Sequence, residues 1–177
     1  SISMTTRAPR PGEIEGVSYF FRTNEQFEKL IKEDAFLEYA CVYDHYYGTP
    51  KRKVLDLIES GKSVLLEIDI QGAMQVKARY PKGVFIYIVP PSLETLSARL
   101  YGRGTDSEDV IQKRLSEITN ELSMAHKYDY MVVNDVLEEA VQKTCAILEA
   151  EKCKLSRNEN HVETIFRQYI NKEVPLK

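Results

Sequence analysis

The residues that could do chemistry in this chain are carboxylates and arginines. Its three histidines and three cysteines show neither HExxH nor CxxC spacing, so we predict no metal site formed by the protein. An odd number of unpaired cysteines is typical of free thiols in a reducing compartment, and we expect a cytoplasmic protein.

Two carboxylates, Glu67 and Asp69, follow the apolar run 64–66. We predict a buried strand over 64–70, in which residues two apart point to the same side. Two carboxylates facing one cleft repel each other, so cations or hydrogen-bond donors should lie opposite them. The alternative is a strand end that frays into water.

Arg7 and Arg10 lie three apart in a turn-rich segment with Pro9, Pro11 and Gly12. Guanidinium groups held in a rigid loop suit phosphate oxygens. Glu13, Tyr19 and the Tyr46-Tyr47 pair could add orienting groups and hydroxyl donors. Without further context, a basic surface loop is the favoured interpretation.

Three further arginines, Arg99, Arg103 and Arg114, surround the glycine-punctuated stretch 101–106. Such an arrangement is typical of a lid over a polyphosphate, where an arginine can contribute roughly 10³–10⁵ in rate. The alternative for Arg114 is an arginine at the margin of an apolar helix face, with its charged end in water. Gly61-Lys62-Ser63 is no phosphate loop, because Asp56 stands where the first glycine belongs and a helix precedes it.

Alternating strands and helices must position these residues. We predict strands over 17–22, 36–43, 64–70, 84–89 and 130–133. Helices should follow Thr23 or Asn24, Ser92 and Asp106-Ser107, and should span 50–61 and about 135–154, the last with an Asp135–Glu138 capping box. This order predicts an α/β fold with a parallel sheet and right-handed crossovers, into which residues 3–62 are inserted as a small lobe.

Composition narrows the class of protein. The chain has 177 residues, 43% of them hydrophobic and 29% charged, with a net charge of −3. These values predict one globular domain, no nucleic-acid partner and no membrane span or signal peptide. Residues 155–177 carry one apolar patch, for which we favour a peripheral helix packed on its own domain over self-association into a homo-oligomer.

Blocks of residues along the chain resemble the guanylate kinase family. They are Ser1-Ile2-Ser3 with Thr5 to Glu13, Phe36 to Ala40, Tyr46 to Thr49, Leu66 to Gly72, Pro90-Pro91-Ser92, Gly102 to Thr105, and Val133-Asn134-Asp135. The resemblance covers residues 1 to about 154 in order, and the tail is similar to the extension of bacterial members. Family members also carry a strand and a GxxxxGK[ST] loop before the first block, and we expect that motif roughly 20–30 residues upstream of Ser1.

The resemblance implies a three-layer parallel sheet of the P-loop nucleoside-monophosphate kinase type. It implies one domain over 1–177, with a GMP-binding lobe at 3–62, a lid at 99–118 and an extension at 155–177. The implied activity is transfer of the γ-phosphoryl group of ATP to GMP, giving GDP and ADP in purine metabolism, with Mg²⁺ bound through the nucleotide phosphates. The alternatives are a non-catalytic module of the same fold that binds a protein partner and, less favoured, a kinase for another monophosphate.

The resemblance also implies roles for individual residues. The positions for the GMP phosphate are Arg7, Arg10, Glu13, Tyr19 and Tyr47, and those for guanine are Ser3, Glu38, Thr49 and Asp69. Arg99, Arg103 and Arg114 match the arginines of the lid and the ATP side. Asn134 and Asp135 match the loop near the adenine. Glu67 matches an acidic position near the phosphates and metal, and it joins Arg7, Arg103 and Arg114 as the catalytic set. For Thr49, a role as the N-cap of the following helix stays open.

Carboxylate acceptors suit guanine, which offers N–H donors at N1 and N2. Adenine presents an acceptor at N1 and lacks the 2-amino group. Such a hydrogen-bond mismatch can discriminate by roughly 10⁴–10⁵.

Overall fold

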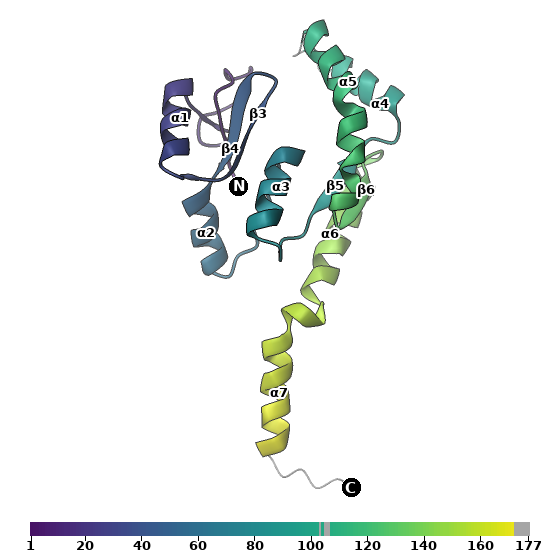
Figure 1. Ribbon diagram of the computed structural model, residues 1–177. Coiled ribbons are helices and arrows are strands. Elements are labelled where there is room, and N and C mark those ends of the chain that lie inside the picture. Colours follow the sequence, from purple (N-terminus) through teal and green to yellow (C-terminus); the bar gives the residue numbers. More distant parts are fainter. Residues whose placement is uncertain (103, 105–106, 172–177) are drawn as a thin grey trace. The chain divides into compact units, whose positions relative to one another are not determined.

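The computed structural model describes residues 1–102, 104 and 107–171 (Figure 1). The chain divides into two compact units, each of which combines helices and strands. The first unit comprises Ser1–Phe85 and Ser97–Lys127, and the second comprises Ile86–Leu96 and Tyr128–Lys177. The α/β class is therefore confirmed.

A four-stranded mixed sheet forms the centre of the first unit. Its strands are β1 (Met4–Thr5), β2 (Phe20–Phe21), β3 (Phe36–Val42) and β4 (His45–Pro50), in the order β2-β1-β4-β3. β1 and β2 are parallel, and β4 runs antiparallel to both β1 and β3. The strand predicted over 17–22 is shorter than expected because the amides of Val17 and Ser18 bond back to the carbonyl of Ile14 in a turn.

An aromatic cluster attaches helix α1 (Asn24–Lys32) to this sheet. The predicted cap is confirmed, since Thr23 and Gln26 form a reciprocal capping box at the start of the helix. Phe27 is fully buried, and its ring stacks on those of Phe36 and Tyr46 at centroid distances of 4.4 and 5.2 Å. This packing fixes the β3–β4 hairpin, which carries several candidate site residues.

Helix α2 (Lys51–Glu59) continues directly from β4, close to the predicted bounds. Pro50 occupies the N-cap position, and Gly61 beyond the helix has a left-handed φ of 79°. No side chain caps the first turn of α2. The alternative role of Thr49 as a helix cap is therefore wrong.

The strand predicted over 64–70 is also wrong. Residues 62–69 belong to no strand, and Ile70 begins helix α3 (Ile70–Arg79), which the sequence analysis did not predict. A strand needs a hydrogen-bonded neighbour, and no described strand pairs with this segment. Leu65 is 70% exposed, so an apolar run alone did not determine burial here.

Two further helices contribute to the first unit. Helix α4 (Leu93–Gly102) begins in the second unit and ends in the first, and Ser92 caps it through a 3.1 Å bond from the Thr95 amide, as predicted. Helix α5 (Glu108–Ser123) follows the N-cap residue Ser107 and is succeeded by the 3₁₀ turn η1 (Ala125–Lys127). Arg103 and Asp106, which the predictions placed at the lid and at the start of α5, lie outside the described residues.

The second unit contains a two-stranded parallel sheet formed by β5 (Ile86–Val89) and β6 (Tyr130–Val133). Helix α6 (Leu137–Lys152), the 3₁₀ turn η2 (Leu155–Arg157) and helix α7 (Glu159–Asn171) follow. The predicted Asp135–Glu138 capping box is wrong, because the N-cap residue is Val136, which makes no side-chain cap bond. The extended backbone at Val136 starts the helix one residue later than the pattern suggested.

A buried carboxylate links the end of α6 to β6. Glu151 is only 5% exposed and accepts bonds from the Tyr130 hydroxyl at 2.5 Å and from Arg157 Nη2 at 3.0 Å, besides an ion pair with Lys154. The hydrogen bond with Lys154, followed by those with Tyr130 and Arg157, lowers the pKa of Glu151 to about 2. This network is structural, since it connects only elements of the second unit.

Candidate active site

The first unit contains a polar pocket of about 280 Å³. It is lined by residues from the opening loop, the β3–β4 hairpin, the segment before α3, and α5. These are Ser3, Arg7, Arg10, Tyr19, Glu38, Val42, Tyr43, Tyr47, Gly48, Glu67, Ile68, Asp69 and Arg114. Thirteen residues from distant parts of the chain thus meet in one place, and most of them are residues that the sequence analysis singled out.

Glu38 is the buried acceptor of this pocket. Its side chain lies on β3 with 2% of the residue exposed, and Thr49, directly opposite on β4, donates from Oγ1 to Glu38 Oε1 at 2.5 Å. Burial raises the pKa of Glu38, the bond from Thr49 opposes this, and the Asp69 carboxylate adds to it. One oxygen of Glu38 is therefore fixed by Thr49.

Asp69 has a position that the sequence analysis did not foresee. It is the N-cap of α3, and its Oδ1 accepts from the amides of Gln71 and Gly72 at 2.7 and 3.1 Å. The cap satisfies amides that the helix leaves without partners. Glu67 and Asp69 therefore line one pocket, as expected, but the helix start rather than a strand pleat orients Asp69.

The absence of a side chain at Gly72 allows α3 to approach Glu38. A Cβ atom built at Gly72 would lie 2.3 Å from Glu38 Oε2 and 3.0 Å from its Cδ. The helix is held at this separation because Gln75 bonds both backbone groups of Tyr39, and Arg79 Nη1 donates to the Leu37 carbonyl at 2.9 Å. These bonds lie on either side of Glu38 along β3.

The basic part of the pocket is organised by Glu13. One of its oxygens accepts from Arg7 Nη2 and the other from the Arg10 amide, both at 2.7 Å. Burial lowers the pKa of Arg7, but hydrogen bonds to Glu13 and Tyr47 outweigh this effect and the pKa is raised. The opening loop with Arg7 and Arg10 therefore does not form only a basic surface, as the sequence had favoured. It holds the charged guanidinium of Arg7 at the pocket.

Two tyrosines lie beside Arg7. Its guanidinium carbon is 5.5 Å from the centroid of the Tyr19 ring, and the rings of Tyr19 and Tyr47 meet edge to face at 6.2 Å. Burial raises the pKa of Tyr19. The Tyr19 hydroxyl therefore remains a protonated donor at neutral pH.

Other predicted residues are distributed unevenly. Arg114, Glu67 and Ser3 line the pocket, whereas Arg99 on α4 does not. Asn134 and Asp135 follow β6 in the second unit, and the Asn134 amide donates to the Val89 carbonyl at 2.7 Å. Arg103 lies outside the described residues. Within the described part of the chain, no cluster of three histidine, cysteine or acidic side chains could hold a metal ion.

The sequence analysis gave no role to several residues of this site, and two of them determine its geometry. Tyr43 lines the pocket from the tip of the β3–β4 hairpin, and Gly72 contacts Glu38. Tyr43 was predicted only as the last residue of the strand over 36–43, and nothing in that pattern indicated that its side chain enters a site. Gly72 was quoted as part of a motif, but no function was attached to it.

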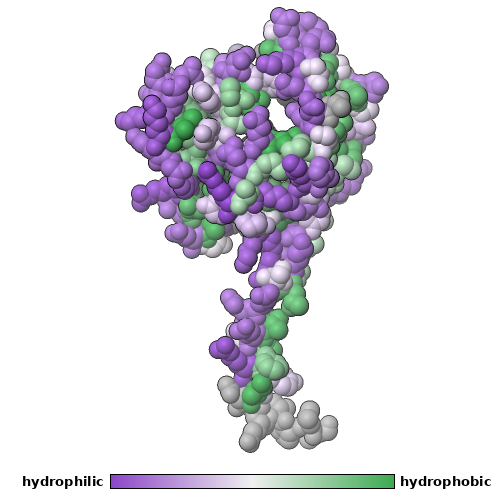
Figure 2. All heavy atoms as spheres, viewed as in Figure 1, coloured by the Kyte–Doolittle hydropathy of each residue, from purple (hydrophilic) through white to green (hydrophobic). Residues whose placement is uncertain are grey.

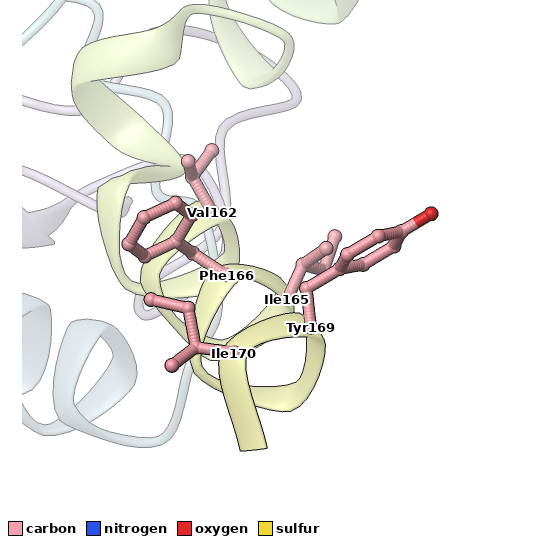
Figure 3. Close-up of a pocket in the computed structure, with 5 residues that line it drawn as sticks. All are labelled: Val162, Ile165, Phe166, Tyr169 and Ile170. Carbon is pink, nitrogen blue, oxygen red and sulfur yellow. The ribbon is translucent and has the colours of Figure 1, made fainter. Parts of the chain in front are cut away.

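A second hollow lies on α7 and is purely apolar. Val162, Ile165, Phe166, Tyr169 and Ile170 project from one side of the helix (Figure 3), and hydrophobic residues are visible along it in Figure 2. Each is between 47% and 67% exposed. With no charged lining residue, this surface does not suit a nucleotide. Whether it packs on its own domain or on a second copy stays a prediction.

Comparison with known proteins identifies the family. A family model described as guanylate kinase matches residues 1–151. The chain belongs to the guanylate kinase family. The guanylate kinase of Caldanaerobacter subterraneus subsp. tengcongensis is 55% identical over 160 residues, which are 90% of this chain and 78% of that relative. The guanylate kinase of Clostridium tetani is 52% identical over 157 residues, or 89% of this chain and 76% of the relative.

A solved guanylate kinase supports the same conclusion. The crystal structure of the enzyme from Anaplasma phagocytophilum has a TM-score of 0.78 and 37% sequence identity, covering 89% of this chain and 77% of that one. The resemblance first noted from short blocks is therefore confirmed at the level of sequence and of fold. The three cysteines of this chain are free, and no described helix is long and apolar enough to cross a bilayer.

Proposed function

We propose that the pocket of the first unit binds GMP and that the protein transfers the γ-phosphoryl group of ATP to it, giving GDP and ADP. The observation that carries this proposal is one pocket with two opposite linings. Glu38 and Asp69 supply acidic acceptors, while Arg7, Arg10 and Arg114 supply cations. A purine monophosphate has N–H donors on its base, which match the acidic lining, and a dianionic phosphate, which matches the basic lining.

Glu38 would read guanine. A carboxylate with one oxygen already held by Thr49 can accept from N1–H or the 2-amino group with the other. Adenine offers neither donor in that position, so its binding would leave a buried carboxylate without a partner. Asp69 and Ser3, which line the same pocket, would complete recognition of the base.

The loop arginines would hold the GMP phosphate. Arg7 is charged and oriented by Glu13, and Arg10 lines the pocket beside it. The hydroxyls of Tyr19 and Tyr47 would donate to the remaining phosphate oxygens. Because Glu13 bonds Arg7 rather than lining the pocket, we assign it an orienting role.

The reaction needs positioning and charge neutralisation more than covalent chemistry. An oxygen of the GMP phosphate attacks the γ-phosphorus of ATP, the bond to the β-γ bridging oxygen breaks, and ADP leaves. Arg114 and Arg7 would stabilise the negative charge on the transferred group. Mg²⁺ would be carried by the ATP phosphates, where it neutralises charge, and the Glu67 carboxylate offers the oxygen ligand that this cation prefers.

The remaining expectations concern the ATP side and the fold around it. Arg99 and Arg103 would belong to a lid over residues 99–118, and Asn134 and Asp135 would lie near adenine. The three-layer parallel sheet of P-loop nucleoside-monophosphate kinases, with residues 3–62 closing on GMP, is the architecture that this function requires. The family relationship supports each of these assignments.

Calorimetry tests the proposal directly. GMP should bind with measurable heat and AMP should bind far more weakly, while a coupled assay should detect ADP formation only when GMP and ATP are both present. A folded preparation that gives no heat with millimolar GMP would contradict the proposal. GMP binding without ADP formation would favour the alternative, a non-catalytic protein-binding module, which the relatives named as kinases do not favour.

A further inference from the structure

The tip of the β3–β4 hairpin is held in an unusual backbone conformation. Tyr43 and Asp44 have φ values of 49° and 65°. Two consecutive left-handed residues form the turn that best joins twisted strands, but glycine and asparagine usually occupy it. A tyrosine in this position is unfavourable for the backbone, so contacts made by its side chain must help to keep the turn in place.

Those contacts are made with α5. The Arg114 guanidinium carbon lies 4.9 Å from the centroid of the Tyr43 ring, and Lys113 Nζ lies 5.7 Å from it. Lys113 Nζ also lies 4.0 Å from an Asp44 carboxylate oxygen. The turn thus presents both of its side chains to one turn of the helix.

The phenol end of Tyr43 lies close to α5 as well. Burial, followed by the carboxylates of Glu117 and Glu121, raises the pKa of Tyr43 to about 12. The phenol is therefore influenced by two carboxylates of α5, while the face of its ring contacts Arg114. A cation over an aromatic ring is oriented without using up its hydrogen-bond donors.

Both partners line the candidate active site. Tyr43 and Arg114 belong to the pocket that also contains Arg7, Tyr47 and Glu38. The same hairpin carries Glu38 and Tyr47 on its strands and Tyr43 at its tip. The position of Arg114 is therefore coupled to the hairpin that forms the GMP side of the pocket.

We propose that Tyr43 is a positioning residue, which acts by holding Arg114 over the pocket for phosphoryl transfer. The inference rests on the proposed function, in which Arg114 stabilises the transferred group. Without the ring, the Arg114 guanidinium would lose the aromatic face that its central carbon approaches at 4.9 Å, and its position over the pocket would change. An error of about 1 Å in the position of a catalytic group can cost on the order of a hundredfold in rate.

Kinetics on Tyr43→Leu, Tyr43→Phe and the control Tyr39→Leu test this inference. Tyr39 is a tyrosine of the same hairpin, is 37% exposed and does not line the pocket. Tyr43→Leu should lower kcat at saturating substrates by about ten- to a hundredfold. The calorimetric Kd for GMP should change less than about threefold, since Arg114 acts on the transferred group. Tyr43→Phe, which keeps the ring, should retain kcat within about threefold of the wild type.

A double-substitution cycle separates positioning from general damage. In an Arg114→Ala background, Tyr43→Leu should lower kcat by less than about twofold, because its effect passes through Arg114. Asp44→Gly keeps the left-handed turn but removes the ion pair with Lys113, so it should lower kcat in the same direction and by a smaller factor. It also provides a test that does not alter the aromatic ring.

Three results would overturn the inference. They are a kcat for Tyr43→Leu equal to that of Tyr39→Leu, equal losses in Tyr43→Phe and Tyr43→Leu, or a full additional loss in the Arg114→Ala background. Wild-type turnover of GMP is measured first. Failure of the proposed function would appear there, in the unsubstituted protein, and is thereby distinguished from failure of the inference.

Discussion

Replacing Gly72 with alanine should weaken GMP binding by about 10- to 150-fold, although alanine normally favours a helix. The new Cβ would lie 2.3 Å from Glu38 Oε2, whereas ordinary contacts of this kind begin at 3.4 Å. The carboxylate oxygen or the helix must therefore move by about 1 Å. Neither movement is easy, because Thr49 holds the other oxygen and bonds from Gln75 and Arg79 hold α3 against β3.

The expected magnitude follows from the bond that is lost. A hydrogen bond to a charged group contributes about 1.5–3 kcal/mol, and each 1.4 kcal/mol corresponds to about a tenfold change in affinity. Alanine gains up to about 1 kcal/mol in helix propensity over glycine. A loss of GMP affinity with little loss of thermal stability would therefore point to displacement of Glu38 rather than to unfolding of α3.

The assay is calorimetry with GMP on Gly72→Ala and on Gly102→Ala. Gly102, the last residue of α4, has nothing within 4 Å of a built Cβ, so its substitution should leave GMP affinity unchanged. In a Glu38→Gln background, Gly72→Ala should cost less than it does in the wild type, because the two residues act on the same contact. Wild-type affinity in Gly72→Ala, or fully additive losses with Glu38→Gln, would refute the reasoning.

The remaining predictions concern Glu38, Glu13 and Glu151. Because burial raises the pKa of Glu38 above 4.5, GMP affinity should fall as the pH drops through that raised value. This fall should be absent in Glu38→Gln. The test is a calorimetric pH series on both proteins, in which protonation of the GMP phosphate affects both equally and cancels when their GMP affinities are compared. Glu13→Gln, which weakens the hold on Arg7, should reduce GMP and AMP affinity by the same factor of about two to ten; a selective loss of GMP would mean that Glu13 affects the base. The pKa of Glu151 is lowered from 4.5 to about 2, chiefly by Lys154, so its stabilising effect should be complete above pH 4.5 and disappear as the pH falls toward 2. The free energies of unfolding in urea should be measured for the wild type and for Glu151→Gln over this pH range. The difference between them should shrink as the pH falls, and a difference that does not change with pH would be evidence against the ion pairs.

Local sequence signals predicted several elements correctly. The Thr23 capping box and the Ser92 cap are formed as expected, because each depends on residues within one helical turn. The strand β6 was also correct, since β-branched and aromatic residues favour extended backbone. The strand over 64–70 was wrong, because pairing depends on a neighbour that the apolar run itself does not specify.

The sequence by itself determined which residue types form the candidate site. Carboxylates at 38, 67 and 69 and arginines at 7 and 10 lie in short blocks, and the order and spacing of these blocks were sufficient to predict the family before any coordinates. Their charges and donors follow from covalent chemistry alone. Together with the resemblance to the family, these groups predict an acidic lining for the base and a basic lining for the phosphate.

Only the tertiary structure decided how these groups are held. The Thr49 hydroxyl turns to Glu38 instead of capping a helix, Asp69 caps α3, and the ring of Tyr43 lies against Arg114. The contact of Thr49 with Glu38 joins two strands of one hairpin, and that of Tyr43 with Arg114 joins a turn to a distant helix, so their geometry depends on sheet register and helix packing rather than on local propensity. That long-range packing converts a set of charged residues into a site with defined acceptors and donors.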